Sequence, residues 1–127
     1  MATRRKKKPR TFTHGHRQGL DLAAEHFLRE CYRHKKPVRA KDFARSLDLT
    51  PKYVSWLAAK ILGGSLHAFL RKKQVEHAAR LLRRTPLSLE EIAARSGFGT
   101  RSTMRRWFEE AYGVGPAAFR GEELSSK

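Results

Sequence analysis

The stretch SGFGTRSTMRRWFEEAYG, residues 96–113, joins a glycine-containing turn to a helix with two unlike faces. The apolar residues recur at i, i+3, i+4 and i+7, namely Met104, Trp107, Phe108 and Ala111. This spacing predicts one helix face packed on a core. The side chains that point away form what we call the arginine face, namely Arg101, Ser102, Arg105 and Arg106. Such a helix is expected to turn its arginines toward a partner.

A second segment repeats this pattern. Residues 42–57, DFARSLDLTPKYVSWL, match residues 91–108, EIAARSGFGTRSTMRRWF, as short helix, turn and second helix. Each short helix carries a small residue, Ala44 or Ala93, and five residues later comes an apolar anchor, Leu49 or Phe98. A small residue lets two helices cross closely, and a short turn sets them roughly perpendicular. The sequence therefore predicts a helix-turn-helix, twice.

The helix-turn-helix arrangement predicts a role for the arginine face. The second helix of a helix-turn-helix lies in the major groove of DNA, with its N-terminal residues on base edges. Arginine pairs bidentately with guanine, and a good pair contributes about 1–3 kcal/mol of discrimination. We interpret the arginine face as a base-reading surface. A solvated basic face beside a core stripe is the alternative.

Helical periodicity extends over the rest of the chain, and no segment alternates with the period of a strand. Ser88 and Glu91 predict a capping box, and Ser65 a helix cap. Helices are expected at 19–33, about 40–47, 51–61, 66–84, between Ser88 and Gly97, up to Gly113, and from Pro116. The predicted fold is all-α, a seven-helix domain over 19–121. It places a first module at about 38–62, a linker helix at about 65–84 and a second module at about 87–113.

Composition points to a polyanionic partner. The 127 residues hold 28 Lys and Arg against 12 Asp and Glu, a formal charge of +16. Nucleic acid is the leading candidate and an anionic membrane surface the second. No apolar run approaches the roughly 20 residues of a membrane-spanning helix, and no signal peptide is visible. The single cysteine cannot form an internal disulfide, so we expect an intracellular protein. A nucleic-acid partner would place it in the cytoplasm, associated with the nucleoid.

Neither the two ends of the chain nor the remaining polar residues predict a catalytic or metal-binding site. Residues 1–18 predict a disordered basic arm, which either contacts DNA or acts as a solubilising tail, and residues 122–127 a loose tail. No phosphate loop, nucleophile elbow or paired metal carboxylates occur, so we expect no enzyme and no cofactor. Cys31 and His34 have metal-like spacing, but Cys31 falls on a core stripe, so no metal site is expected. The paired glutamates at 90–91 and 109–110 read as helix-terminus and surface charges.

Residues 20–121 resemble the DNA-binding domain of the AraC/XylS family of bacterial transcription regulators. The resemblance rests on LSLEEIAARSGFGTRSTMRRWFEEAYGVGPAAFR at 87–120 and on AARLL at 78–82. It implies a sequence-specific transcription factor that binds double-stranded promoter DNA through two recognition helices and acts on RNA polymerase. Most members add a sensing or dimerisation domain, whereas this sequence is similar to the short, free-standing members. A fragment whose sensor is encoded elsewhere is the alternative.

Carried over by position, the resemblance implies DNA contacts from both modules. The second would use the arginine face, and the first would use Lys52, Ser55 and Trp56. The first module departs from the family pattern at Arg39, Trp56 and Ala58, and the linker helix departs from it at Gln74. These departures predict weaker packing and readout in the first module. Trp56 therefore has two interpretations, contact with DNA or packing over Ala58 or the linker helix.

Further alternatives follow from the charge and the spacer. The linker helix would be roughly 28 Å long, close to the roughly 34 Å repeat of DNA, so one chain could span two groove openings. The sequence does not decide between monomer and dimer. The cations of the linker helix have two interpretations, contact with DNA phosphates or a solvated face. They are Arg71, Lys72, Lys73, Arg80, Arg83 and Arg84. The rival functions are a nucleoid-type architectural protein without sequence preference and the DNA-binding module of a larger complex.

Overall fold

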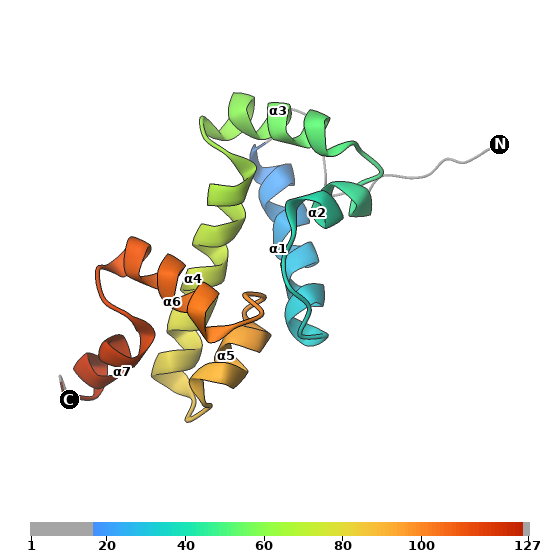
Figure 1. The fold of residues 1–127 in the computed structure, drawn as a ribbon. Helices are drawn as coiled ribbons and strands as arrows, with labels where there is room; N and C mark the ends of the chain where they lie inside the picture. The colour runs from blue at the N-terminus through green and yellow to red at the C-terminus, as the bar shows by residue number, and fades with distance from the viewer. Residues whose placement is uncertain (1–16, 126–127) are drawn as a thin grey trace. The chain divides into compact units, whose positions relative to one another are not determined.

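The structure, a computed structural model, describes residues 17–125, with side chains described through residue 121. Within that range all regular secondary structure is helical, which confirms the predicted fold class. The helices of Figure 1 are α1 (Arg17–Arg33), α2 (Ala40–Ser46), α3 (Pro51–Leu62), α4 (Leu66–Arg84), α5 (Leu89–Arg95), α6 (Arg101–Tyr112) and α7 (Pro116–Ser125). None of these helices has both the length and the hydropathy needed to cross a membrane.

The helix bounds differ from the predicted ones mainly at the two ends. α1 begins at Arg17, inside the stretch interpreted as the basic arm, and the arm's residues 1–16 lie outside the described residues. α7 runs on to Ser125, past the predicted start of the tail. The described residues divide into two compact units, residues 17–29 with 38–70, and residues 30–37 with 71–125. We call them unit 1 and unit 2.

Unit 1 packs the first module around α1. Six side chains from α1, α2 and α3 are fully buried, namely Leu20, Ala24, Phe43, Ala44, Val54 and Ala58. The rings of Phe27 and Phe43 lie 5.2 Å apart and join α1 to α2. Arg39 precedes α2 and makes no capping hydrogen bond through its side chain. α2 therefore starts without the cap that Ser88 gives α5.

Unit 2 packs the second module against the C-terminal part of α4, as Figure 1 shows for α5 and α6. Its buried cluster draws on α4, α5, the following turn and α6, and comprises Val75, Ala78, Ala79, Leu82, Ile92, Ala93, Phe98, Met104 and Phe108. Two polar side chains add hydrogen bonds between segments of unit 2. Buried Gln74 donates from Nε2 to the Ser96 carbonyl at 3.0 Å. Arg120 of α7 donates to the carbonyls of Leu82, Thr85 and Leu87.

The two modules share one turn geometry. In the first, the Leu49 amide donates to the Ala44 carbonyl at 3.0 Å, and Asp48 has a left-handed φ of 59°. In the second, the Phe98 amide donates to the Ala93 carbonyl at 3.0 Å, and Gly97 has a φ of 74°. Each is the bond of a Schellman motif, which stops a helix and reverses the chain. The repeat predicted from sequence is thus a repeat of backbone hydrogen bonds.

A cap on each side fixes the second helix of each module. The Thr50 hydroxyl accepts from the Tyr53 amide at 3.1 Å, and the Thr100 hydroxyl accepts from the Thr103 amide at 3.2 Å. Gly63 and Gly113 end α3 and α6 in the left-handed conformation, with φ of 74° and 81°. α3 and α6 therefore both begin and end at defined residues.

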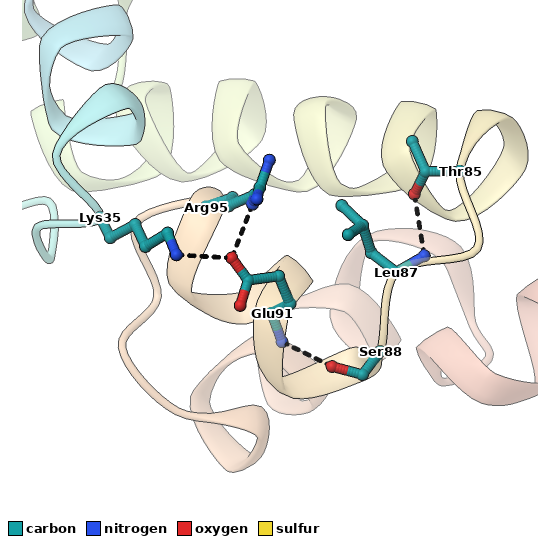
Figure 2. Close-up of polar contacts among 6 residues, drawn as sticks. All are labelled: Lys35, Thr85, Leu87, Ser88, Glu91 and Arg95. Atoms are coloured by element: carbon teal, nitrogen blue, oxygen red, sulfur yellow. Dashed lines mark hydrogen bonds and ion pairs between the residues drawn. The ribbon is translucent and has the colours of Figure 1, made fainter.

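The capping box predicted at Ser88 and Glu91 is half formed (Figure 2). The Ser88 hydroxyl accepts from the Glu91 amide at 3.1 Å, which confirms the cap. The Glu91 carboxylate turns instead to Lys35 Nζ at 2.8 Å and Arg95 Nε at 2.7 Å, because two cations attract it more strongly than one amide does. The bond with Lys35, followed by that with Arg95, lowers the pKa of Glu91 to about 2.

Replacing Glu91 should reveal this pairing through its pH dependence. Because the folded pKa lies below the ordinary value of 4.5, the stabilisation is complete above about pH 4.5 and disappears as the pH falls toward 2. Glu91→Gln should therefore lower the urea midpoint at about pH 7, and the difference from wild type should vanish near pH 2. Glu76→Gln on α4 is the charge-matched control. A difference that stays constant over this range would contradict the assignment.

Phe108 should carry much of the stability of unit 2. Its side chain is fully buried in the cluster, so Phe108→Ala should cost about 3–5 kcal/mol in free energy of unfolding. Tyr112, 40% exposed and in contact with the Phe108 ring, offers a comparison on the same helix. Tyr112→Ala should cost clearly less in the same urea titration. Equal losses would mean that the burial of Phe108 is not what holds α6.

Candidate nucleic-acid interface

The arginine face of α6 is open to solvent. Its members Arg101, Ser102, Arg105 and Arg106 are all exposed, as predicted. On the core face Met104 and Phe108 retain at most 1% of their surface. Ala111, predicted to lie on that face, is exposed instead, because the last turn packs through Tyr112, whose ring lies 5.4 Å from that of Phe119. The buried stripe is therefore shorter than predicted, and DNA contact by the arginine face stays a prediction.

Arg101 is tied to the preceding helix. Its Nη1 donates to Glu90 Oε2 at 3.2 Å, so a carboxylate of α5 meets the first residue of α6. Glu90's own backbone amide, followed by Arg101, lowers the pKa of Glu90. Both side chains are more than half exposed, at 55% for Arg101 and 68% for Glu90. An ion pair this exposed adds little stability and opens readily for another anion.

Arg105 is paired within its own helix. Its Nε donates to Glu109 Oε2 at 3.1 Å, one helical turn away. A cavity of about 570 Å³ lies against this pair, with walls from α6 and from the start of α7. Its lining includes Arg101, Ser102, Arg105, Glu109, Pro116 and Ala117. Three of the four candidate residues of the arginine face thus border one hollow of unit 2.

Trp107 joins α6 to α4 through a stacked cation. The Arg71 guanidinium carbon lies 3.4 Å from the centroid of the indole ring, and that of Arg106 lies 5.1 Å from it. Burial lowers the pKa of Arg71, while Glu110 opposes this change. Arg71 therefore packs on the Trp107 ring, a contact that neither interpretation of the linker-helix cations anticipated. Phosphate contact by Arg71 stays a prediction.

The candidate residues of the first module share a face of α3. Lys52 and Ser55 are exposed, and Trp56 keeps 53% of its surface exposed. Trp56 stacks on Tyr53 with ring centroids 5.7 Å apart, and Lys60 Nζ lies 5.8 Å from its ring. Ala58 itself is fully buried. The indole stacks along its own helix, and both interpretations of Trp56, contact with DNA and packing over Ala58 or the linker helix, stay predictions.

Sequence reasoning missed the acidic partners of the arginines. Glu90 and Glu109 were read only as helix-terminus and surface charges, yet each contacts a residue of the arginine face. The spacing of Arg105 and Glu109, one helical turn, was a usable signal. No local pattern links Glu90 to Arg101, because they lie on different helices and meet only through the turn between them.

Comparison with known proteins agrees with this geometry. A family model described as a helix-turn-helix domain matches residues 43–122. The uncharacterized HTH-type transcriptional regulator YfiF of Bacillus subtilis (strain 168) is 33% identical over 92 residues, which is 72% of this chain and 29% of that protein. The chain spans less than a third of the length of such curated regulators.

Solved structures give the same architecture. The C-terminal domain of AraT, a response regulator from Geobacillus stearothermophilus, aligns with a TM-score of 0.66 at 29% identity, over 79% of this chain and 84% of that one. The DNA-binding domain of AdpA, a global transcriptional factor in complex with a target DNA, aligns with a TM-score of 0.70. That alignment covers 85% of this chain and 91% of that one at 23% identity, and it shows the fold. With its family model matching well over half of its length, the chain belongs to the helix-turn-helix proteins, among the AraC-type DNA-binding domains.

Proposed function

We propose that this chain binds double-stranded DNA sequence-specifically and regulates transcription from bacterial promoters. α6 would read bases through the arginine face, and α3 through Lys52, Ser55 and Trp56. Regulation would act on RNA polymerase in the cytoplasm, with the protein held at the nucleoid. A domain with two such helices can act as a monomer, and the other parts of a longer regulator would add sensing or dimerisation.

The observation that carries the proposal is the arginine face itself. It lies on a helix with a capped start, a defined end and a buried stripe that prevents rotation. Exposed arginines on a rigid helix of a helix-turn-helix are the groups that reach guanine edges in the major groove. The AdpA domain, similar in fold, was solved with a target DNA, which supports the same partner for this chain.

Binding without sequence preference is the second candidate. The charge of +16 attracts any duplex, and α2 of the first module begins without a side-chain cap. Selection from a randomised duplex library at about physiological salt distinguishes the two. A specific regulator should give a motif and bind it at least about 10³-fold more tightly than scrambled DNA. Binding that gives no motif and falls away as salt rises would favour the architectural function.

Substitutions on the arginine face should change base preference. Arg101→Ala and Arg105→Ala should each relax selection at a particular base pair and cost about 1–3 kcal/mol on the selected site. Lys72→Ala on α4 is the control, because an exposed lysine in contact with phosphate affects all sequences alike and reduces the salt slope by about one. Arginine variants that keep the wild-type motif would remove α6 as the reading helix.

Trp56 should report whether the first module reads DNA. Its exposed indole leaves the core unchanged when removed, so Trp56→Ala should keep the thermal midpoint within a few degrees of wild type. If α3 contacts bases, the wild-type motif spans about two turns of DNA, and the variant loses selection in one half. A wild-type motif of one turn, unaffected by Trp56→Ala, would confine readout to the second module.

A further inference from the structure

We propose that Glu109 is a positioning residue for base readout, which holds the Arg105 guanidinium in the orientation that guanine requires. This inference rests on the proposed function and names a specificity determinant within it. A guanidinium carries one N–H on its inner nitrogen and four on its two terminal nitrogens. Glu109 Oε2 accepts from the inner one, Nε, at 3.1 Å. The terminal pair is then the fork that remains for a base edge.

The carboxylate of Glu109 lies close to the turn that follows α6. A Cβ added at Gly115 would lie 3.3 Å from Glu109 Oε2 and 3.9 Å from Arg105 Cγ, so the ion pair rests directly on the turn between α6 and α7. The backbone of Glu109 is fixed, because its carbonyl accepts from the Gly113 amide at 2.8 Å. Through Glu109 the Arg105 side chain is thus linked to the ordered last turn of α6, and in this inference that link limits the rotamers that Arg105 samples.

Stability does not account for this pair. The Arg105 side chain is 72% exposed and that of Glu109 is 46% exposed, and a pair so open to water contributes little to folding. Near DNA a carboxylate also repels phosphates and lowers affinity for every sequence. We therefore attribute the negative charge of Glu109, beside the arginine face, to selectivity. An arginine that is already oriented discriminates between acceptors better than one that adapts to any of them.

The other two glutamates nearby differ in ways that make the assignment specific. Glu90 accepts from a terminal nitrogen of Arg101, so that pair has to open before Arg101 can present its full fork. Glu110, next in sequence to Glu109, acts on Arg71 of α4 instead. Glu110 is exposed like Glu109 and offers the same change in charge without contact to Arg105. It is the matched control.

The test measures affinity for the selected duplex and for scrambled DNA. Glu109→Ala and Glu110→Ala should both bind scrambled DNA somewhat more tightly, since each removes one repulsive charge. Only Glu109→Ala should lower the ratio of specific to scrambled affinity, by about fivefold to tenfold, within the range of one bidentate pair. The lost preference should fall at the base pair that Arg105→Ala also affects, and the double variant should lose no more than Arg105→Ala alone.

A conservative variant separates positioning from charge. Glu109→Gln removes the charge but keeps an acceptor oxygen at the same reach, so it should retain more of the base preference than Glu109→Ala. Thermal unfolding of all variants should match wild type, as their exposure implies. A motif and affinity ratio left unchanged by Glu109→Ala would overturn this inference alone, as would equal behaviour of the Gln and Ala variants. A wild-type protein that selects no motif would overturn the proposed function together with it.

Discussion

The burial of Met104 and Phe108 beneath α6 is the constraint on which the rest of unit 2 depends. These two residues sit one turn apart and are enclosed by α4 and α5. A helix locked at two such points cannot rotate about its axis. The direction of every other side chain on α6 is then fixed, including the arginines that border the cavity. The surface proposed to contact DNA is in this sense a consequence of core packing.

The turns show how far local sequence determines this fold. Asp48 and Gly97 differ in chemistry, yet both accept a left-handed backbone, and each permits the same hydrogen bond from the turn back to the first helix of its module. Helix periodicity, caps and turn residues act over a few positions, so the helices, the repeat and the cap at Ser88 followed from the sequence. The start of α1 and the end of α7 did not, because helix ends lack a packing partner that marks them.

Side-chain partners across the fold could not be read in the same way. Lys35 reaches Glu91, and Arg71 reaches Trp107, only because the chain brings distant segments together within unit 2. The sequence holds many charged and aromatic residues, and nothing in it indicates which of them contact one another. The exposure of the arginine face followed from periodicity, but its acidic partner on α5 depends on the approach of two helices. Exposed and buried positions were therefore easier to predict than contacts.

Excess positive charge creates a problem that the placement of the carboxylates addresses. A chain of formal charge +16 is attracted to any duplex, and phosphate contacts carry no sequence information. Arginines free to turn toward phosphates would add to that attraction at the expense of reading bases. On α6 the two arginines nearest the cavity each meet a carboxylate first. An acceptor on the protein has to be matched or replaced by one on DNA, and a guanine edge offers two acceptors, O6 and N7, at one fixed position in the groove. Under the proposed function, the acids would oppose the general attraction and leave the geometry of the base edge to decide where the protein binds.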